Sequence, residues 1–286
     1  MLKFFSFCCF IDKIPKEDLC FGLKMLLSSL DHYVKNYEII IYTNFDIDMN
    51  HKNVIIRNYY DNKNIKYCDG DTPFDRWFNL SFNKMNIYKD LYDEYNENYI
   101  WIDLDTLVMS DISYLENVDN FFTEVGGNIK GQQSAIVHDH FYLNEPSRGI
   151  QGSLWKLNIQ IYNSLVETLD ELNKQNLKIA YDFQGLATYY LYAKLNGQLN
   201  EEKINVLGLN YQINSMNGLA VWSDDNDKRY SCNIDGLSKL YFENDVLKTK
   251  IYPEKEIHFL TFTFISLNEN KNSEIFKELF KHILNF

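Results

Sequence analysis

About the first 110 residues alternate between short apolar runs and longer segments in which apolar positions recur with helical spacing. Residues 4–10 form a continuous apolar run of strand length, and leucines recur with a helical period after Pro15. Proline suits the first turn of a helix, because the N–H that it lacks would have no partner there. Two more strand-like runs follow at 38–43 and 53–57. This order predicts an α/β fold with a mixed, mostly parallel sheet flanked by helices.

The rest of the chain predicts further elements of both kinds. A helix is expected from 77 to 91, and it leads through a polar turn into an apolar run at 98–108. The other expected elements are a loop at 61–71, a helical turn at 111–115, strands at 121–125, 134–138, 149–155 and 256–259, helices at 159–173, 183–195 and 273–284, and an acidic loop at 223–229. No repeat or proline-rich linker divides the sequence. We therefore expect a single compact domain over residues 1–286, with halves at about 1–110 and 111–286.

The segment 98–108 ends a run of large apolar side chains with two carboxylates one position apart, Asp103 and Asp105. Side chains two apart on a strand point to the same face, so these two would converge while Leu104 points the opposite way. A buried carboxylate needs a cation, strong donors or a place at the open end of the sheet, where α/β folds bind ligands. The alternative is that the aspartates only cap the following turn. The apolar context favours a metal site.

Composition narrows the classes of partner. A chain of 286 residues can bury a sizeable core. Its formal net charge of -12 argues against nucleic acid or an anionic membrane as a partner, because both need a basic surface. A phosphate ligand would therefore need a bound cation. No apolar run approaches the roughly twenty residues of a membrane span.

The cysteines and the first residues of the chain indicate the cellular compartment that we expect for the protein. The five cysteines are odd in number, and Cys8 and Cys9 are adjacent without metal-ligand spacing. Reduced thiols of a cytoplasmic protein fit this usage better than a disulfide framework. Residues 1–11 read as a first strand, because charged residues follow directly and no small-residue cleavage site is present.

Residues 99–108, followed by Ser110, Asp111 and Ile112, resemble the metal-binding strand of GT-A glycosyltransferases with their Asp-x-Asp motif. Within that fold the chain is most similar to glycogenin-like and lipopolysaccharide galactosyltransferase-like enzymes. The resemblance implies a metal-dependent hexosyltransferase that moves a sugar from a nucleotide-diphosphate sugar, a UDP-sugar, to a hydroxyl acceptor. Retention of anomeric configuration is implied, because the enzymes it resembles are retaining. The first half would bind the donor and the second half the acceptor.

The same resemblance assigns residues of the aspartate strand and its surroundings. Asp103 and Asp105 would hold Mn²⁺ or Mg²⁺, and with Leu104 they would contact the donor. Lys84 occupies the place of a basic residue on the preceding helix, where it would stabilise the leaving diphosphate. The alternative for Lys84 is an exposed helix lysine. Gly152, in a glycine-punctuated strand, would lie against the donor and acceptor sugars, because glycine lets a ligand approach the backbone closely.

Four further positions, three later in the chain and one earlier, complete the predicted site. Asp182 and Gln184 resemble the family's Asp-Gln motif, with one residue inserted between the pair, and would face the anomeric centre. Asp182 has two alternatives, a helix N-cap and the base of an inverting enzyme. His258 resembles the histidine that completes the metal shell, although 260–264 replaces the glycine and lysine that usually follow. Asp12 follows the first strand, where the fold holds the nucleoside, and would contact ribose or base.

The chemistry explains these residue types. A divalent cation that bridges diphosphate oxygens neutralises the charge that develops as the leaving group departs. Oxygen ligands suit Mg²⁺ or Mn²⁺, and an imidazole favours Mn²⁺.

Two other functions remain open. One is a catalytically silent nucleotide-sugar or carbohydrate-binding module of the same fold, and the other is a nucleotidyltransferase, which should carry a glycine-rich loop that 10–17 lacks. The apolar stripe of the predicted helix 273–284 is expected to dock on the core, with peripheral membrane contact as the alternative.

Overall fold

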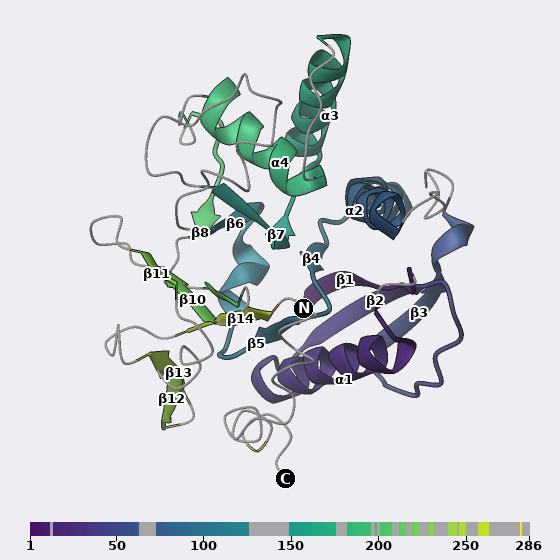
Figure 1. The fold of residues 1–286 in the computed structure, drawn as a ribbon, viewed down its shortest axis with the longest axis vertical. Coiled ribbons are helices and arrows are strands. Elements are labelled where there is room, and N and C mark those ends of the chain that lie inside the picture. Colours follow the sequence, from purple (N-terminus) through teal and green to yellow (C-terminus); the bar gives the residue numbers. More distant parts are fainter. Residues whose placement is uncertain are drawn as a thin grey trace.

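The computed structural model describes most of the chain, and Figure 1 shows how its elements are arranged. The described residues are 1–11, 14–62, 73–125, 149–175, 182–195, 198, 201–207, 212–215, 219–222, 229–231, 240–244, 246–249, 257–262 and 281. The elements predicted at 61–71, 134–138, 223–229 and 273–284 lie wholly or largely outside these residues. Among the described helices, none has the length and apolar character needed to cross a membrane.

A large sheet forms the centre of the fold, with the strand order β3-β2-β1-β4-β7-β6-β8. Its strands are β1 (Leu2–Cys8), β2 (Tyr37–Thr43), β3 (Val54–Asn58), β4 (Ile100–Ile102), β6 (Phe121–Val125), β7 (Gly149–Lys156) and β8 (Val206–Leu207). β1 is parallel to β2 and β4, β2 to β3, and β6 to β8, whereas β7 is antiparallel to β4 and β6. The predicted mixed, mostly parallel sheet is confirmed.

Helices cover both faces of this sheet. α1 (Lys16–Tyr33) lies on one face, and α2 (Pro73–Tyr95), α3 (Ile159–Lys174) and α4 (Asp182–Thr188) contribute to the core on the other (Figure 1). Alternate strand residues serve the two cores. Phe4 and Ile39 pack with the leucines of α1, whereas Phe5 and Ile40 pack with the opposite cluster. Because both faces are buried, these strands read as continuous apolar runs in the sequence.

A second sheet has the order β11-β10-β9-β14-β5. Its strands are β5 (Thr106–Val108), β9 (Gln212–Ser215), β10 (Leu219–Trp222), β11 (Arg229–Ser231) and β14 (Phe259–Phe262), and β12 (Leu240–Glu243) forms a hairpin with β13 (Val246–Thr249). The backbone N–H of Val108 donates to the Ser29 hydroxyl of α1 at 3.1 Å. β5 therefore lies against α1 on one side and pairs with β14 on the other.

Two boundaries differ from the sequence prediction. The strand expected at 256–259 begins at Phe259, because residues 259–262 are the ones that pair with β5 and β9. Ile257 and Phe259, on either side of His258, are both buried. The helix expected at 183–195 divides into α4 and a π-helical segment, η3 (Tyr189–Lys194), in which Leu195 N donates to Tyr190 O at 2.9 Å. Short 3₁₀ segments, η1 (Tyr59–Asp61) and η2 (Ser113–Asn117), complete the described elements.

Candidate active site

The two aspartates lie on a turn that joins the two sheets. β4 ends at Ile102, and the N–H of Thr106 donates to the carbonyl of Asp103 at 3.0 Å, so Leu104 and Asp105 are the central residues of a tight turn. The N–H of Asp103 donates to Ser153 O of β7 at 2.7 Å. The prediction that one continuous strand carries both aspartates is therefore wrong. A turn brings the carboxylates together instead, and we call residues 103–106 the aspartate turn.

The aspartate turn lies at the point where the strand order reverses. The chain runs from β1 through α1 to β2 on one side of β1, whereas β4 is the neighbour on the other side. In α/β sheets, ligands bind outside the carboxyl ends of the strands at such a reversal. The aspartate turn follows the carboxyl end of β4. The sequence therefore folds so that its two carboxylates occupy the position where this architecture binds ligands.

The segment that leaves β1 reaches the same edge of the sheet. Phe10 N donates to Asn44 Oδ1 at 2.7 Å, and Asn44 Nδ2 donates to Phe10 O at 2.8 Å. These two bonds fix the chain beyond β1 to the chain beyond β2. Asp12, which was predicted to contact the nucleoside, comes two positions later and lies outside the described residues.

Lys84 reaches this site from α2. Its side chain is buried, with 8% exposure, which excludes the alternative of a solvent-exposed helix lysine. The ammonium lies 3.0 Å from Asp103 Oδ1 and 3.4 Å from the carbonyl oxygen of Gly152. It also lies 4.6 Å from the centre of the Trp101 ring. Lys84 is therefore held by a carboxylate, a carbonyl and an aromatic face, all next to the aspartate turn.

The electrostatics of the turn favour a cation. Burial raises the pKa of the Asp105 carboxyl well above its usual range, and the negative charge of Asp103 raises this pKa further. The Lys84 ammonium acts in the opposite direction but is the smaller effect. Asp105 as a whole residue is only partly buried, so a ligand can approach the turn that carries it. Among the described residues, two carboxylates share one ammonium here, and a bound divalent ion would remove the remaining repulsion.

Gly152 and Gln184 meet on the other side of Lys84. Gly152 N donates to Gln184 Oε1 at 3.2 Å, and Thr188, one turn further along α4, accepts a bond from Ile150 N at 3.0 Å. A Cβ added to Gly152 would lie 3.4 Å from Gln184 Cβ, which is ordinary contact. β7 and α4 are therefore joined at the backbone that Lys84 touches. Asp182 begins α4, and its side chain is not among those described.

His258 directly precedes β14 in the second sheet and is displaced along the strand direction from the aspartate turn. Phe259 is paired with Val108, and Met109 N donates to His258 O at 2.8 Å, so His258 stands opposite Met109. Its ring packs edge-on against Tyr114, with 5.7 Å between ring centres. Three positions at about 3.4 Å each separate Thr106, where β5 begins, from Met109, so His258 lies roughly 10 Å along the strand from the level of Thr106. The structure thus brings Lys84, Gly152 and Gln184 to the aspartates, and it places His258 beyond the far end of β5, against Tyr114.

Sequence reasoning missed three contributors to the site. Ser153 and Thr261 are buried hydroxyls behind the aspartate turn, and Thr261 Oγ1 lies 3.1 Å from Thr106 Oγ1 and 3.4 Å from Ser153 Oγ. A threonine or serine in a strand carries no signal that would single it out. Trp101 is the third, and a signal for it was present. It stands two positions before Asp103 in the predicted strand 98–108, in which alternation would place both side chains on one face.

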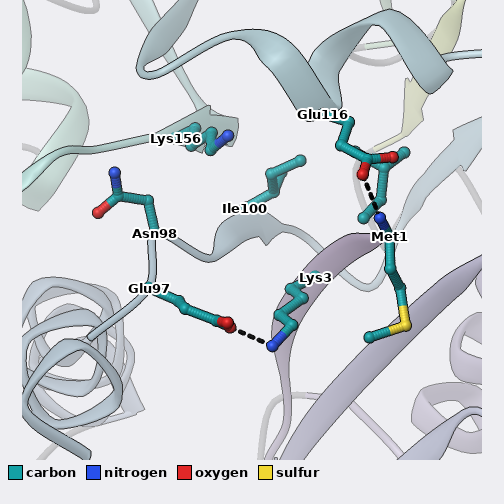
Figure 2. Close-up of a pocket in the computed structure, with 8 residues that line it drawn as sticks. Met1, Lys3, Glu97, Asn98, Ile100, Glu116 and Lys156 are labelled. Atoms are coloured by element: carbon teal, nitrogen blue, oxygen red, sulfur yellow. Dashed lines mark hydrogen bonds and ion pairs between the residues drawn. The ribbon is translucent and has the colours of Figure 1, made fainter. Parts of the chain in front are cut away.

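A small cavity of about 150 Å³ lies at the opposite end of the strands. Figure 2 shows it lined by Lys3, Glu97, Asn98 and Lys156, with an ion pair between Lys3 and Glu97. Lys3 belongs to the start of β1, whereas the aspartate turn follows the end of β4, and β1 and β4 are parallel. The cavity is therefore separate from the candidate site.

The two-sheet arrangement is a glycosyltransferase fold. Among solved structures, the chain is similar to the apo structure of WbbM, a bifunctional glycosyltransferase, with a TM-score of 0.53 and 16% sequence identity. The match covers 98% of this chain and 51% of that one, so this chain spans about half its length. At this identity the likeness shows the fold. No family model and no curated protein matches the sequence.

Proposed function

We propose that this chain is a glycosyltransferase that moves a hexose from a nucleotide-diphosphate sugar to a hydroxyl acceptor, with a divalent cation held at the aspartate turn. The observation that carries the proposal is the charge arrangement at the reversal of strand order. Asp103 and Asp105 lie together there, and within the described part of the chain Lys84 is the one cationic side chain recorded beside them. The recorded charges there leave an excess of negative charge, at the edge of the sheet where the fold binds ligands, and this excess favours a bound cation.

The donor set fits Mg²⁺ or Mn²⁺. Within the described residues, no group of three or more histidine, cysteine, aspartate or glutamate side chains is placed to hold a metal ion. Two carboxylates are nevertheless enough for such ions, which take one or two carboxylates and complete their shell with substrate phosphates and water. His258 is not needed for this arrangement, and its role as a ligand stays a prediction from the family resemblance. The bound ion would act as a Lewis acid on the departing diphosphate.

Lys84 is placed to share the charge of the diphosphate. An ammonium has three N–H donors, and Asp103 and Gly152 accept two of them. Within the residues that the structure describes no acceptor is recorded for the third, which we expect to meet an incoming phosphate oxygen. A positive charge that is already fixed in a buried position stabilises developing negative charge without reorganising during the reaction.

The hexose is expected to lie where Gly152 and Gln184 meet. The Gly152 backbone borders the Lys84 ammonium, and the Gln184 side-chain oxygen is held on the Gly152 N–H. A UDP-sugar donor and retention of configuration belong to the proposal because the motifs resemble retaining enzymes.

A panel of nucleotide-sugars tests the proposal. With Mn²⁺ present, we expect one donor, a UDP-hexose, to raise the melting temperature and to release its nucleoside diphosphate slowly by hydrolysis. Binding at 100 times the Kd stabilises a protein by about 2.7 kcal/mol, which a thermal shift resolves. The matched arm replaces Mn²⁺ with EDTA, and both the shift and the release should disappear.

Two outcomes would contradict the proposal. If EDTA leaves both the thermal shift and the release intact, the metal dependence is wrong. If no nucleotide-sugar in the panel binds in the presence of Mn²⁺, the assignment as a glycosyltransferase is wrong for this chain.

A further inference from the structure

We propose that Trp101 is a positioning residue of this site: its indole N–H fixes the Asp103 carboxylate, and its ring face holds the Lys84 ammonium. The proposal rests on the proposed function, since it takes Asp103 to be a ligand of the cation. It goes further by naming the residue that decides which carboxylate oxygen the cation meets.

The indole N–H selects one oxygen of Asp103. Trp101 Nε1 lies 2.9 Å from Asp103 Oδ1, and the Lys84 ammonium lies 3.0 Å from the same atom. Two donors therefore hold Oδ1, and among the described residues no donor is recorded for Oδ2. A carboxylate held in this way presents its other oxygen in a fixed direction. Side chains that orient metal ligands typically contribute 10–100-fold to metal affinity.

The ring of Trp101 places the ammonium as well. Lys84 Nζ stands 4.6 Å from the ring centre, within the range of a cation–π contact. The lysine is thus held between the aromatic face and the Asp103 carboxylate. The Trp101 side chain therefore positions both the Asp103 carboxylate and the Lys84 ammonium.

Trp101 can hold these groups because it is itself immobile. Its side chain is 1% exposed. Phe5 and Phe7 of β1 meet it edge-on, with ring centres at 5.1 Å and 4.7 Å, and Trp155 stacks on it at 6.1 Å with 21° between the planes. Trp155 is also its cross-strand pair on β7. Such aromatic contacts and cross-strand pairs leave the indole one orientation.

The chain offers a matched control in that same stack. Trp155 is fully buried and packs on Trp101 and on Phe183, 4.3 Å between ring centres. Its Nε1 makes no hydrogen bond within the described part of the chain. Trp101→Phe and Trp155→Phe therefore remove the same atoms from the same aromatic cluster. Only the first removes a donor to Asp103.

Affinity for Mn²⁺ alone, measured by electron paramagnetic resonance of the free ion, tests the proposal without a donor sugar. We expect Trp101→Phe to bind Mn²⁺ at least tenfold more weakly than the wild type, and Trp155→Phe to stay within twofold of it. Equal loss in the two variants would show that the stack acts only through packing and would overturn the positioning role. Wild-type affinity in Trp101→Phe would overturn it too.

A wild-type protein that binds no Mn²⁺ would instead overturn the metal dependence on which the proposal rests, so the two failures are distinguishable. Should Trp101→Phe not fold, the wild type provides a second measurement. Mg²⁺ should shift the indole ¹H–¹⁵N resonance of Trp101 and leave that of Trp155 in place. The reverse pattern would exclude Trp101 as the link to the cation.

Discussion

Asp105→Asn abolishes transfer and at the same time stabilises the metal-free protein. We expect a loss of activity of about a thousandfold or more, because a metal supplies several kcal/mol of charge stabilisation and each 1.36 kcal/mol is a factor of ten in rate. Stability should rise, because burial and the charge of Asp103 raise the pKa of the Asp105 carboxyl, so its ionised form is disfavoured in the folded state. Steady-state release of nucleotide and thermal melts in EDTA measure the two effects.

Asp103→Asn separates the two effects. It should lose activity to the same degree, but it should not gain stability, since it also gives up the ion pair with Lys84 at 3.0 Å. Asp111→Asn is the matched control, because Asp111 is exposed and its carboxylate accepts bonds from Ser113 instead of facing the turn. Transfer at the wild-type rate in Asp105→Asn or Asp103→Asn would contradict the assignment of a catalytic metal ion to the aspartate turn.

Lys84→Met is expected to slow the chemical step by about 10²–10³-fold while weakening donor binding much less. A fixed charge acts more strongly on the developing diphosphate than on the bound donor, and loss of one such electrostatic group costs about this much. Methionine keeps the length and apolar stem of lysine, so packing against Trp101 survives. Single-turnover rates and donor affinity measured side by side give the two numbers.

A second buried lysine provides the control. Lys156 is as buried as Lys84, but its ammonium donates to the carbonyls of Leu115 and Val118, far from the aspartate turn. Lys156→Met should lower stability without changing the chemical rate. In metal-free buffer, Lys84→Met should also melt lower than the wild type, and Mn²⁺ should recover more of its stability, because the ion replaces the missing charge. A wild-type single-turnover rate in Lys84→Met would assign the lysine a structural role only.

The sequence predicted the large sheet because its strands are buried on both faces. Continuous apolar runs such as 4–10 and 38–43 are readily interpreted as strands when turns and segments of helical period separate them. The second sheet was harder to predict, because its strands are as short as three residues and pair with strands that lie far away in the sequence. Thr106–Val108 pairs with Phe259–Phe262, about 150 positions later, and nothing local indicates that register.

The candidate site shows the same division. Lys84, Gly152 and Gln184 could be predicted because their motifs keep the order of a known family, and the fold does bring them together. The position of His258 depends on the register of β14, which a local motif does not fix, and a shift of a few residues moves a side chain by more than the reach of a metal bond. The role of Trp101 depends on a hydrogen bond to its second neighbour, which only coordinates reveal.

The strand that follows the aspartates is also the outermost strand of its sheet, and a bare sheet edge invites pairing with another chain. Met109 N donates to the carbonyl oxygen of His258, the residue before β14, and N–H groups two apart on a strand point the same way. The N–H of Leu107 therefore points toward β14, and those of Thr106 and Val108 point outward. Thr106 donates to the Asp103 carbonyl and Val108 to the Ser29 hydroxyl. The same turn that gathers the carboxylates thus closes the edge against intermolecular strand addition, so the chain can expose its charged turn to solvent without offering a template for aggregation.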